Sequence, residues 1–256
     1  MLLISLQSGS NGNCIYLEIA GVRLLFDAGI SGRQAEGRLA GHGLDIRRVD
    51  ALIISHDHAD HARYAGVYQR KFKLPLYLTP TTLEAAADKY PLGRLEKVCP
   101  FQAGGKMQFG KVTLETIPTP HDGADGVAFV VSVNRWRLGL LTDLGHPFNG
   151  LQEIISSLDG VLLESNYDNE MLAEGPYPRF LKERIQGPGG HLSNLEAAEL
   201  LGSAARKRLK WACLAHLSEH NNHPDLAVKT HRQRLPAHFP LFVASRYTST
   251  ALTPTF

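Results

Sequence analysis

Short apolar runs, bounded by glycine, proline or polar residues, recur along the chain and alternate with amphipathic stretches. Short apolar runs between turn residues indicate strands, and apolar positions three or four apart indicate helices. The pattern predicts strands over 2–6, 14–19, 22–26, 50–55, 76–78, 106–109, 112–117, 127–133, 137–141, 159–164, 211–215 and 241–244. It predicts helices over 31–44, 59–72, 81–90, 147–158, 193–206 and 224–235, and broken helix over 171–185. Strands that alternate with helices are typical of an α/β fold.

The chain length and composition bound the domain organisation. With 256 residues, 43% of them hydrophobic and 20% charged, the chain can bury a substantial core without a disulfide scaffold. No linker or low-complexity stretch interrupts it, so we predict a single domain over residues 1–256. Each half contains strands that end in His or Asp, which indicates two similar halves.

The overall charge gives no sign of a nucleic-acid binder. The chain has 27 Lys and Arg residues against 25 Asp and Glu residues, a formal net charge of +2. A role in binding nucleic acid must therefore depend on local patches. Basic residues do gather near predicted helix ends: Arg63, Arg70, Lys71, Lys73, Arg206, Lys207, Arg208 and Lys210. Favourable interaction with the helix C-terminus is their default explanation, and contact with a nucleic-acid backbone is the alternative.

The cysteines and the N-terminal sequence indicate the compartment. Cys14, Cys99 and Cys213 are widely spaced and form no C-x-x-C motif, which suits a reducing cytosol better than a secreted protein. The N-terminus lacks a basic segment with a cleavage site, and no apolar run approaches membrane-spanning length. We therefore expect a soluble, cytoplasmic protein with no membrane partner.

The stretch from Leu52 to His61 holds the densest candidate chemistry. A buried strand leads into His56, His58, Asp60 and His61, and imidazole and carboxylate are ligands for zinc, manganese or iron. In an extended turn His56 and His58 project to the same side, while Asp60 and His61 begin the next helix and face back. Such a turn could serve two neighbouring metal ions. The alternative is a solvated histidine-rich loop, which the preceding buried strand argues against.

Further candidate ligands follow other predicted strands. His121, Asp143 and His216 each come at the end of a strand, and His121 alone would be unremarkable without the histidine-rich stretch. Asp27 and Glu164 also end strands, and Asp27 could simply cap its turn.

Two loops could bind anions. The Gly/Asn/Ser loop over 8–13 has backbone NH groups that could hold a phosphate, although a plain hairpin turn explains it equally well. His191 precedes Ser193 and Glu196, which form a capping box, so His191 lies beside a helix N-terminus. Its alternative role is to bond a backbone carbonyl.

The motif H-x-H-x-D-H after a buried strand, with the later strand-end residues, resembles the metallo-β-lactamase superfamily. The resemblance implies a four-layer αββα sandwich with two similar halves and a dinuclear metal centre. By the same resemblance, His56, His58 and His121 hold one ion, Asp60, His61 and His216 hold the other, and Asp143 bridges them. Asp27 would support a metal-binding histidine and fix its tautomer, and Asp60 would also act in catalysis.

The expected cofactors are two divalent ions, zinc or manganese, with iron as a further option. Two dications about 3.5–4 Å apart lower the pKa of a shared water and hold both the attacking and the leaving oxygen. Because the ligands are mostly neutral imidazoles, the site keeps a net positive charge, which suits an anionic phosphodiester. This chemistry predicts a hydrolase.

Closer motifs are similar to those of the bacterial YycJ/WalJ family. They are Ser8-Gly9-Ser10-x-Gly12-Asn13, Thr142-Asp143-Leu144-Gly145, Glu164-Ser165-Asn166-Tyr167-Asp168, Tyr177-Pro178-x-x-Leu181-Lys182-x-Arg184-Ile185, Gly190-His191-Leu192-Ser193-Asn194 and His216-Leu217-Ser218-x-x-Asn221-Asn222. The family is described as 5′→3′ DNA exonucleases linked to mismatch repair. The candidate substrate contacts within these motifs are Ser10, Asn13, Asn166, Ser193 and Asn194.

Gly190-His191-Leu192-Ser193 also resembles the Gly-His-Ser-Thr motif of tRNA 3′-processing endonucleases, whose histidine aids proton transfer. The resemblance implies this catalytic role for His191, with Glu164 as its partner. The chain departs from the larger nuclease branches, since Asp143 and His216 are too close in sequence for a large inserted cap domain. An obvious long arm rich in glycine and proline is also missing.

These observations predict a dinuclear-metal phosphodiesterase, a 5′→3′ DNA exonuclease in DNA repair, with nucleic acid as its partner and DNA favoured over RNA. One alternative is a small-molecule hydrolase of cyclic phosphodiesters or thioesters, and another is an RNA-processing nuclease. A non-catalytic, metal-stabilised binding module is disfavoured, because a purely structural site needs no bridging carboxylate. The sequence gives no prediction of the oligomeric state.

Overall fold

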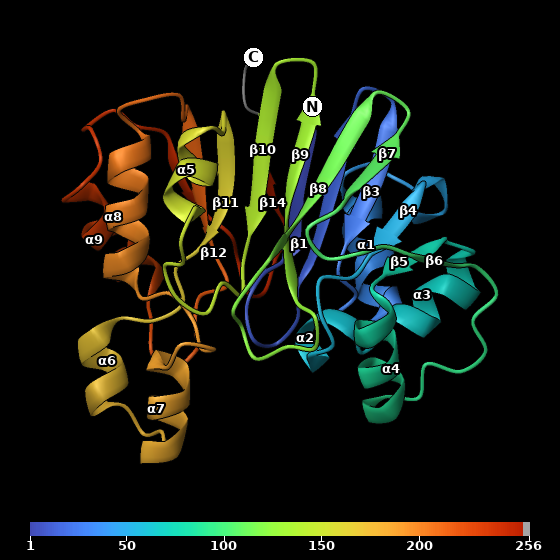
Figure 1. The fold of residues 1–256 in the computed structure, drawn as a ribbon, viewed down its shortest axis with the longest axis horizontal. Coiled ribbons are helices and arrows are strands. Elements are labelled where there is room, and N and C mark those ends of the chain that lie inside the picture. The colour runs from blue at the N-terminus through green and yellow to red at the C-terminus, as the bar shows by residue number, and fades with distance from the viewer. Residues whose placement is uncertain (253–256) are drawn as a thin grey trace. The chain divides into compact units, whose positions relative to one another are not determined.

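The structure is a computed structural model that describes residues 1–252 (Figure 1). The chain divides into two compact units. The first unit comprises Met1–Pro118, Gly123–Val127 and the C-terminal segment from Ser245, and the second unit comprises Thr119–Asp122 and Ala128–Ala244. A single domain over 1–256 stays a prediction.

The first unit contains a seven-stranded mixed sheet in the order β14-β1-β2-β3-β4-β5-β6. Its strands are β1 (Leu2–Gln7), β2 (Cys14–Ile19), β3 (Val22–Phe26), β4 (Ala51–Ile53), β5 (Leu76–Leu78), β6 (Val98–Pro100) and β14 (Thr250–Leu252). The pairs β14-β1, β1-β2 and β2-β3 are antiparallel, and the pairs from β3 to β6 are parallel. The carboxyl ends of β3, β4 and β5 therefore meet at one edge of the sheet.

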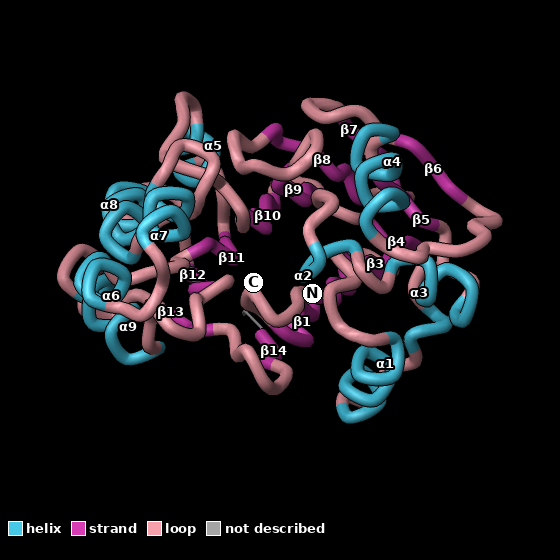
Figure 2. The backbone as a smooth tube through the Cα atoms, turned by 90° about the horizontal axis from the view of Figure 1, so that it is seen from below, coloured by secondary structure: helices cyan, strands magenta, loops and turns pink. Residues whose placement is uncertain are grey.

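Helices and a hairpin complete the first unit. They are α1 (Gly32–Gly41), the 3₁₀ turn η1 (Ile46–Arg48), α2 (Ala59–Ala62), α3 (Ala65–Phe72), α4 (Pro80–Lys89) and the hairpin of β7 (Lys106–Phe109) with β8 (Val112–Pro118). Helices α1 and α3 pack against each other and against β1 and β4, on one face of the sheet (Figure 2). Apolar side chains from that face and from these helices form one buried core.

The second unit contains a mixed sheet that runs in the order β13-β12-β11-β10-β9 within this unit. Its strands are β9 (Val127–Val133), β10 (Trp136–Leu141), β11 (Gly160–Glu164), β12 (Trp211–Ala215) and β13 (Leu241–Val243). Strand β9 is antiparallel to β10, whereas β10 to β13 are parallel. The carboxyl ends of β10, β11 and β12 therefore lie side by side at one edge.

Five helices belong to the described part of the second unit: α5 (Leu151–Ser156), α6 (Asn169–Glu174), α7 (Arg179–Gln186), α8 (Asn194–Ala204) and α9 (Pro224–Arg232). Helix α8 packs against α5 and α9, and α9 contacts β13. In Figure 1, α6 and α7 form a pair beyond the carboxyl ends of β11 and β12. The α/β class predicted from the sequence is confirmed in both units.

Several predicted helix boundaries are wrong. The helix expected over 59–72 is two helices, α2 and α3, because the chain leaves helical geometry at Tyr64, whose NH group donates to the carbonyl of Ala28. The helix expected from Pro147 begins only at Leu151, after Gly150 with φ +90°. The strands β6 and β14 were not predicted from the sequence, because neither is an apolar run: β6 ends in Pro100 and β14 begins with Thr250.

The three cysteines differ in burial. Cys14 and Cys213 are buried in β2 and β12, Cys99 is half-buried, and all three are thiols. Burial raises the pKa of Cys14 to about 12, so its thiol stays neutral at physiological pH. Within residues 1–252, the helices are too short or too polar to cross a membrane.

Candidate metal centre

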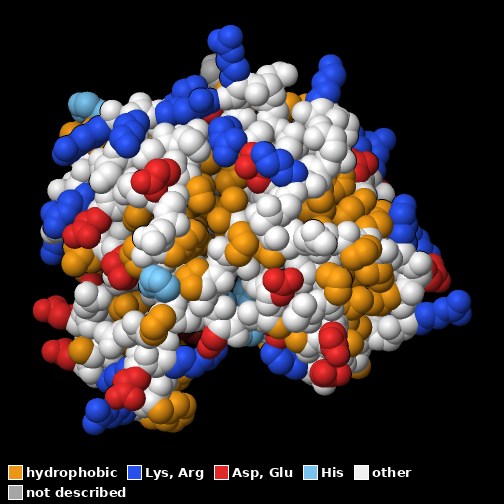
Figure 3. Space-filling model, in the orientation of Figure 1, with side chains coloured by type: hydrophobic (Ala, Val, Ile, Leu, Met, Phe, Trp, Pro, Cys, Tyr) orange, Lys and Arg blue, Asp and Glu red, His pale blue; other side chains and the backbone are white. Residues whose placement is uncertain are grey.

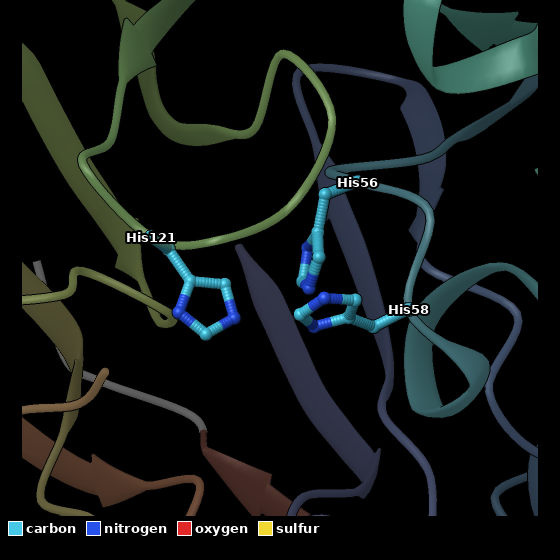
Figure 4. A group of neighbouring side chains, drawn as sticks. All are labelled: His56, His58 and His121. Atoms are coloured by element: carbon cyan, nitrogen blue, oxygen red, sulfur yellow. The ribbon is translucent and has the colours of Figure 1, made fainter. Parts of the chain in front are cut away.

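The first unit presents four donor side chains from the turn after β4, namely His56, His58, Asp60 and His61. His58 is the N-cap residue of α2, so Asp60 and His61 lie in the first turn of that helix. The ring centroids of His56 and His58 are 4.7 Å apart, and those of His56 and His61 are 4.1 Å apart. Figure 4 draws the rings of His56 and His58 close to one another. We name this set the histidine turn.

Asp27, which follows β3, fixes the tautomer of His61. Its Oδ2 atom accepts a hydrogen bond from Nδ1 of His61 at 2.8 Å, and its Oδ1 atom accepts one from the NH group of Ser55 at 2.8 Å. The His61 proton therefore lies on Nδ1, and Nε2 carries the lone pair that a metal ion needs. This Nε2 atom is 3.4 Å from Oδ2 of Asp60.

Asn13, from the Gly/Asn/Ser loop, also contacts the histidine turn. Its Nδ2 atom lies 3.2 Å from Oδ2 of Asp60 and 3.0 Å from Nε2 of His61, and its Oδ1 atom accepts from the NH group of Gly9. Asn13 is buried, whereas Ser10 at the tip of the same loop is exposed. The loop therefore supports two donor residues directly.

Asp57, the other carboxylate of the histidine-rich stretch, has a structural role. Its buried side chain forms an ion pair with Lys89 of α4 and accepts a hydrogen bond from the NH group of Ala124 at 2.6 Å. Burial would raise the pKa of Asp57, but the hydrogen bonds from Lys89 and Ala124 outweigh it and lower the pKa. Asp57 thus remains ionised and holds Ala124 against α4.

The second unit brings four donor side chains together: Asp143, Glu164, His191 and His216, each with a ligand atom within 4.8 Å of the others. Asp143 follows β10, Glu164 is the last residue of β11, and His216 follows β12. These strands are parallel neighbours, so their carboxyl ends place the three side chains at one edge of the sheet. We name this set the strand-end cluster.

His121 lies beside the strand-end cluster. Its Nδ1–H group donates to the carbonyl of Gly190 at 2.8 Å, so that Nε2 carries the lone pair (His121 is also drawn in Figure 4). This Nε2 atom is 3.8 Å from Oδ1 of Asp143, and Nε2 of His216 is 3.6 Å from the same oxygen. His121 and His216 thus converge on one carboxylate.

The donor sets fit divalent metal ions. Nitrogen and oxygen ligands that bind one ion at about 2.0–2.2 Å lie about 3–3.5 Å from each other. The separations of 3.4 Å in the histidine turn and of 3.6 Å and 3.8 Å in the strand-end cluster are near this spacing and too long for hydrogen bonds. Together with the Nδ1–H tautomers of His61 and His121, these distances fit the binding of a metal ion by imidazole and carboxylate groups.

Glu164 is fully buried and joins several parts of the strand-end cluster. Its Oε1 atom accepts from Nδ1 of His191 at 2.5 Å, and its Oε2 atom accepts from the NH group of Leu144 at 3.0 Å. Burial alone would raise the pKa of Glu164, but the adjacent His191 and His216 outweigh it and hold the pKa below its usual range. Glu164 is therefore an anion that orients His191, whose Nε2 atom faces away from it.

The remaining sequence candidates, Asn166, Ser193 and Asn194, are bonded to the protein itself. Asn166 donates to the carbonyl of His216 at 2.9 Å. Ser193 caps α8 through the predicted capping box with Glu196. Asn194 accepts from the hydroxyl of Ser165 at 2.6 Å and donates to Asn222 at 2.9 Å.

Asn222 was missed as a site residue by the sequence analysis. Its amide donates to the carbonyls of Ser165 and Asn166 at 2.9 Å and 3.0 Å, which ties the end of β11 to the segment after β12. The available signal was the adjacent pair Asn221-Asn222 soon after His216, although nothing in that spacing shows which partners it takes.

Most of the basic residues proposed as a nucleic-acid patch are engaged within the protein. Lys71 pairs with Glu36 and Lys73 with Glu96. Arg70 donates to the carbonyl of Leu92. Arg208 and Lys210 both pair with Asp159. On the face shown in Figure 3, Lys and Arg side chains predominate in the upper part of the view, and most Asp and Glu side chains lie lower.

Comparison with known proteins gives relatives along most of the chain. The family model described as the metallo-beta-lactamase superfamily matches residues 8–148. The chain is 35% identical over 227 residues to exodeoxyribonuclease WalJ of Streptococcus pneumoniae serotype 2, covering 88% of this chain and 84% of that protein. It is 34% identical over 224 residues to exodeoxyribonuclease YycJ of Bacillus anthracis, covering 87% and 84%.

Among solved structures, the metallo-beta-lactamase fold protein YhfI from Bacillus subtilis superimposes with a TM-score of 0.75 and 17% identity, covering 98% of this chain and 99% of that chain. At this identity the likeness concerns the fold. The fold class predicted from the sequence, a metallo-β-lactamase-like α/β sandwich, is confirmed.

Proposed function

Because the chain belongs to the metallo-β-lactamase superfamily and, within it, to the WalJ/YycJ family, we propose that it is a dinuclear-metal phosphodiesterase that degrades DNA from the 5′ end during DNA repair. The superfamily and the named relatives make it a metal-dependent hydrolase. The observation that carries the proposal of a nuclease is the 35% identity with an exodeoxyribonuclease over 88% of the chain.

The proposed ligands are those that the superfamily resemblance implied. His56, His58 and His121 would hold one divalent ion, Asp60, His61 and His216 would hold the other, and Asp143 would bridge them. The Nδ1–H tautomers of His61 and His121 support this assignment, because each leaves Nε2 for the ion. Two such ions, zinc, manganese or iron, would activate a water and neutralise charge on a phosphodiester.

We further propose that His191 transfers a proton to the departing oxygen of the substrate. Glu164 fixes one proton on Nδ1 of His191 and orients the ring, so that Nε2 is the atom that would exchange a proton with substrate. The His191 side chain is 18% exposed, so a substrate oxygen can reach it from solvent. Asp60, besides its role as a ligand, is proposed to accept a hydrogen bond from the attacking water.

The test uses purified protein loaded with Zn²⁺ or Mn²⁺. DNA and RNA strands of equal sequence, single-stranded and duplex, are labelled at the 5′ or the 3′ end. We expect a 5′ label on DNA to be released as a mononucleotide at the earliest times, and a 3′ label to give a ladder of shortening fragments. Asp143→Asn is the control for a contaminating nuclease.

Other outcomes would point to other functions. Cleavage of RNA alone would replace the proposal with an RNA-processing nuclease. Hydrolysis of bis(p-nitrophenyl) phosphate without attack on any polynucleotide would indicate a small-molecule hydrolase. A steep loss of rate with rising salt would be expected only for a polynucleotide substrate, because its binding releases counterions.

A further inference from the structure

Helix α7 presents an exposed aromatic ring that the proposed chemistry does not use. None of its residues is buried. Phe180 is 71% exposed, which is more than any other exposed large hydrophobic side chain within residues 1–252. In Figure 3, hydrophobic, basic and acidic side chains reach the surface together in the region of α6 and α7. A single exposed hydrophobic residue is ordinary on a protein surface, so the position of Phe180 beside Arg184 and the other cations of α7 is the informative observation.

Phe180 lies on the same face of α7 as Arg184, whose side chain reaches the surroundings of the strand-end cluster. Phe180 and Arg184 are four residues apart, so they share one face of the helix. Arg184 donates to the carboxylate of Asp122 at 2.6 Å and 3.0 Å, and Asp122 directly follows His121. Arg184 also lines a small pocket together with His121 and His191. All these contacts lie within the second unit.

Phe180 lies about one helical turn before Arg184 on that face of α7. Four residues of helix rise about 6 Å. A substrate group bound at His191 would reach Arg184 first, and only an extended ligand would continue to Phe180.

The charge of α7 indicates the kind of ligand. Arg179 pairs with Glu183, Arg184 pairs with Asp122, and Lys182 donates to the carbonyl of Ala173. With both carboxylates counted, the three cations leave a formal charge of +1 (three minus two). The Arg179 side chain is 92% exposed and pairs with Glu183 within the same helix. A flat apolar ring flanked by cations is complementary to a nucleic-acid strand, because each nucleotide combines an aromatic base with an anionic phosphate.

We propose that Phe180 stacks on an unpaired base of the substrate strand while the cations of α7 contact its phosphates. The proposal rests on the proposed nuclease function and adds a requirement for the substrate, namely a single-stranded segment that extends beyond the nucleotide at the scissile bond. A small diester such as bis(p-nitrophenyl) phosphate does not reach Phe180 and does not depend on it.

The experiment compares Phe180→Ala, Phe180→Trp and the matched control Phe242→Ala in the metal-loaded protein. Phe242 lies in β13 of the same unit and is 44% exposed. Binding of a phosphorothioate single-stranded DNA, which resists cleavage, is measured by fluorescence anisotropy. We expect Phe180→Ala to raise Kd by about 5- to 150-fold, the range of one base–aromatic stack. The Phe242→Ala variant and the turnover of bis(p-nitrophenyl) phosphate should stay unchanged.

Two further readouts separate stacking from other roles. In Phe180→Trp, addition of the oligonucleotide should quench tryptophan fluorescence more than in the wild type, and the affinity should be retained. The salt dependence of binding should keep its slope in Phe180→Ala, because no charge is removed, whereas Arg179→Ala should reduce the slope.

The outcomes distinguish this proposal from the proposed function. If the wild type binds and cleaves DNA while Phe180→Ala does so equally well, the stacking proposal is overturned and the nuclease function stands. An equal loss on DNA and on bis(p-nitrophenyl) phosphate would show that Phe180 supports the fold of the cluster and would also overturn it. If the wild type neither binds nor cleaves any polynucleotide, the proposed function fails, and the stacking proposal fails with it.

Discussion

In the first unit, the donor side chains His56, His58, Asp60 and His61 come from one short turn, whereas in the second unit each donor follows a different element. The histidine turn depends on residues far along the sequence for its orientation, chiefly Asp27 and Asn13. The strand-end cluster depends on the parallel order of β10, β11 and β12 for its very assembly. The contrast indicates that the first set is specified by local sequence and the second by topology.

Both units nevertheless use the same backbone feature at the ends of strands. Asp27 after β3, Asp143 after β10 and His216 after β12 have φ values of +65°, +57° and +55°. A residue in the left-handed region ends the extended strand in a single step, at a cost of order 1–3 kcal/mol for a side chain other than glycine. The strain is smaller for Asp than for most residues, because its short carboxylate can form a hydrogen bond with the nearby backbone.

The largest effect is expected from the strand-end cluster. Asp143→Ala removes the carboxylate on which His121 and His216 converge. A bridging carboxylate fixes the separation of two dications and offsets their repulsion, so its loss should remove several kcal/mol of transition-state stabilisation, about 10³-fold or more in kcat/KM. Metal analysis should find fewer than two ions per chain, and circular dichroism should be unchanged. Two tightly held ions with normal turnover would refute the bridging assignment.

His191→Ala tests the proton transfer within the same cluster. We expect kcat to fall by about 10²–10⁴-fold, the usual scale of general acid–base help, with little change in metal content. The loss should shrink for bis(p-nitrophenyl) phosphate, because nitrophenolate leaves without a proton. An equal loss on both substrates would indicate that His191 positions phosphate at the N-terminus of α8. Loss of an ion would make His191 a ligand.

The difference between the two donor sets also explains what could be predicted from the sequence. The histidine turn is found from spacing alone, since four donors directly follow a buried strand. Most strands of the two mixed sheets are found from their apolar runs. His121, Asp143 and His216 are each ordinary strand-end residues, and only the resemblance joined them to the histidine turn.

Other contacts lie beyond sequence analysis because they depend on long-range packing. His121 donates to the carbonyl of Gly190, and Asn222 donates to the carbonyl of Ser165. Each acceptor is a backbone oxygen, which every residue has, so the sequence does not identify it. The break at Tyr64 likewise arises from a hydrogen bond to Ala28, which no local propensity encodes.

Asp27 tests whether the histidine turn needs its distant support. Asp27→Ala should weaken metal binding by about 10- to 100-fold, because His61 loses the acceptor that fixes its tautomer. Asp27→Asn keeps a carbonyl acceptor and tolerates positive φ, so it should restore part of the affinity. Titration with a competing chelator measures both. Equal affinity in the Ala variant and the wild type would show that the turn is oriented by its local sequence alone.

The smallest effect concerns a buried histidine outside both donor sets. His231 in α9 is fully buried, its Nδ1–H group donates to the carbonyl of Ala227 at 2.8 Å, and Nε2 has no hydrogen-bond partner among the described residues. Burial lowers the pKa of His231 to about 4, despite the opposing effect of the Ala227 bond. Between pH 6.5 and pH 4 the unfolded chain therefore binds a proton that the folded chain excludes, so His231 makes the folded state less stable as the pH falls, by up to about 1.4 kcal/mol per pH unit.

The measurement uses metal-depleted protein, so that loss of ions does not contribute to the pH dependence. Urea unfolding at pH 7.5 and pH 5 should show a smaller loss of unfolding free energy in His231→Leu than in the wild type, because leucine takes up no proton. His238→Leu is the control, since His238 is exposed and should keep the wild-type pH dependence. If His231→Leu lost as much stability between the two pH values as the wild type, the buried imidazole would have to gain its proton without cost.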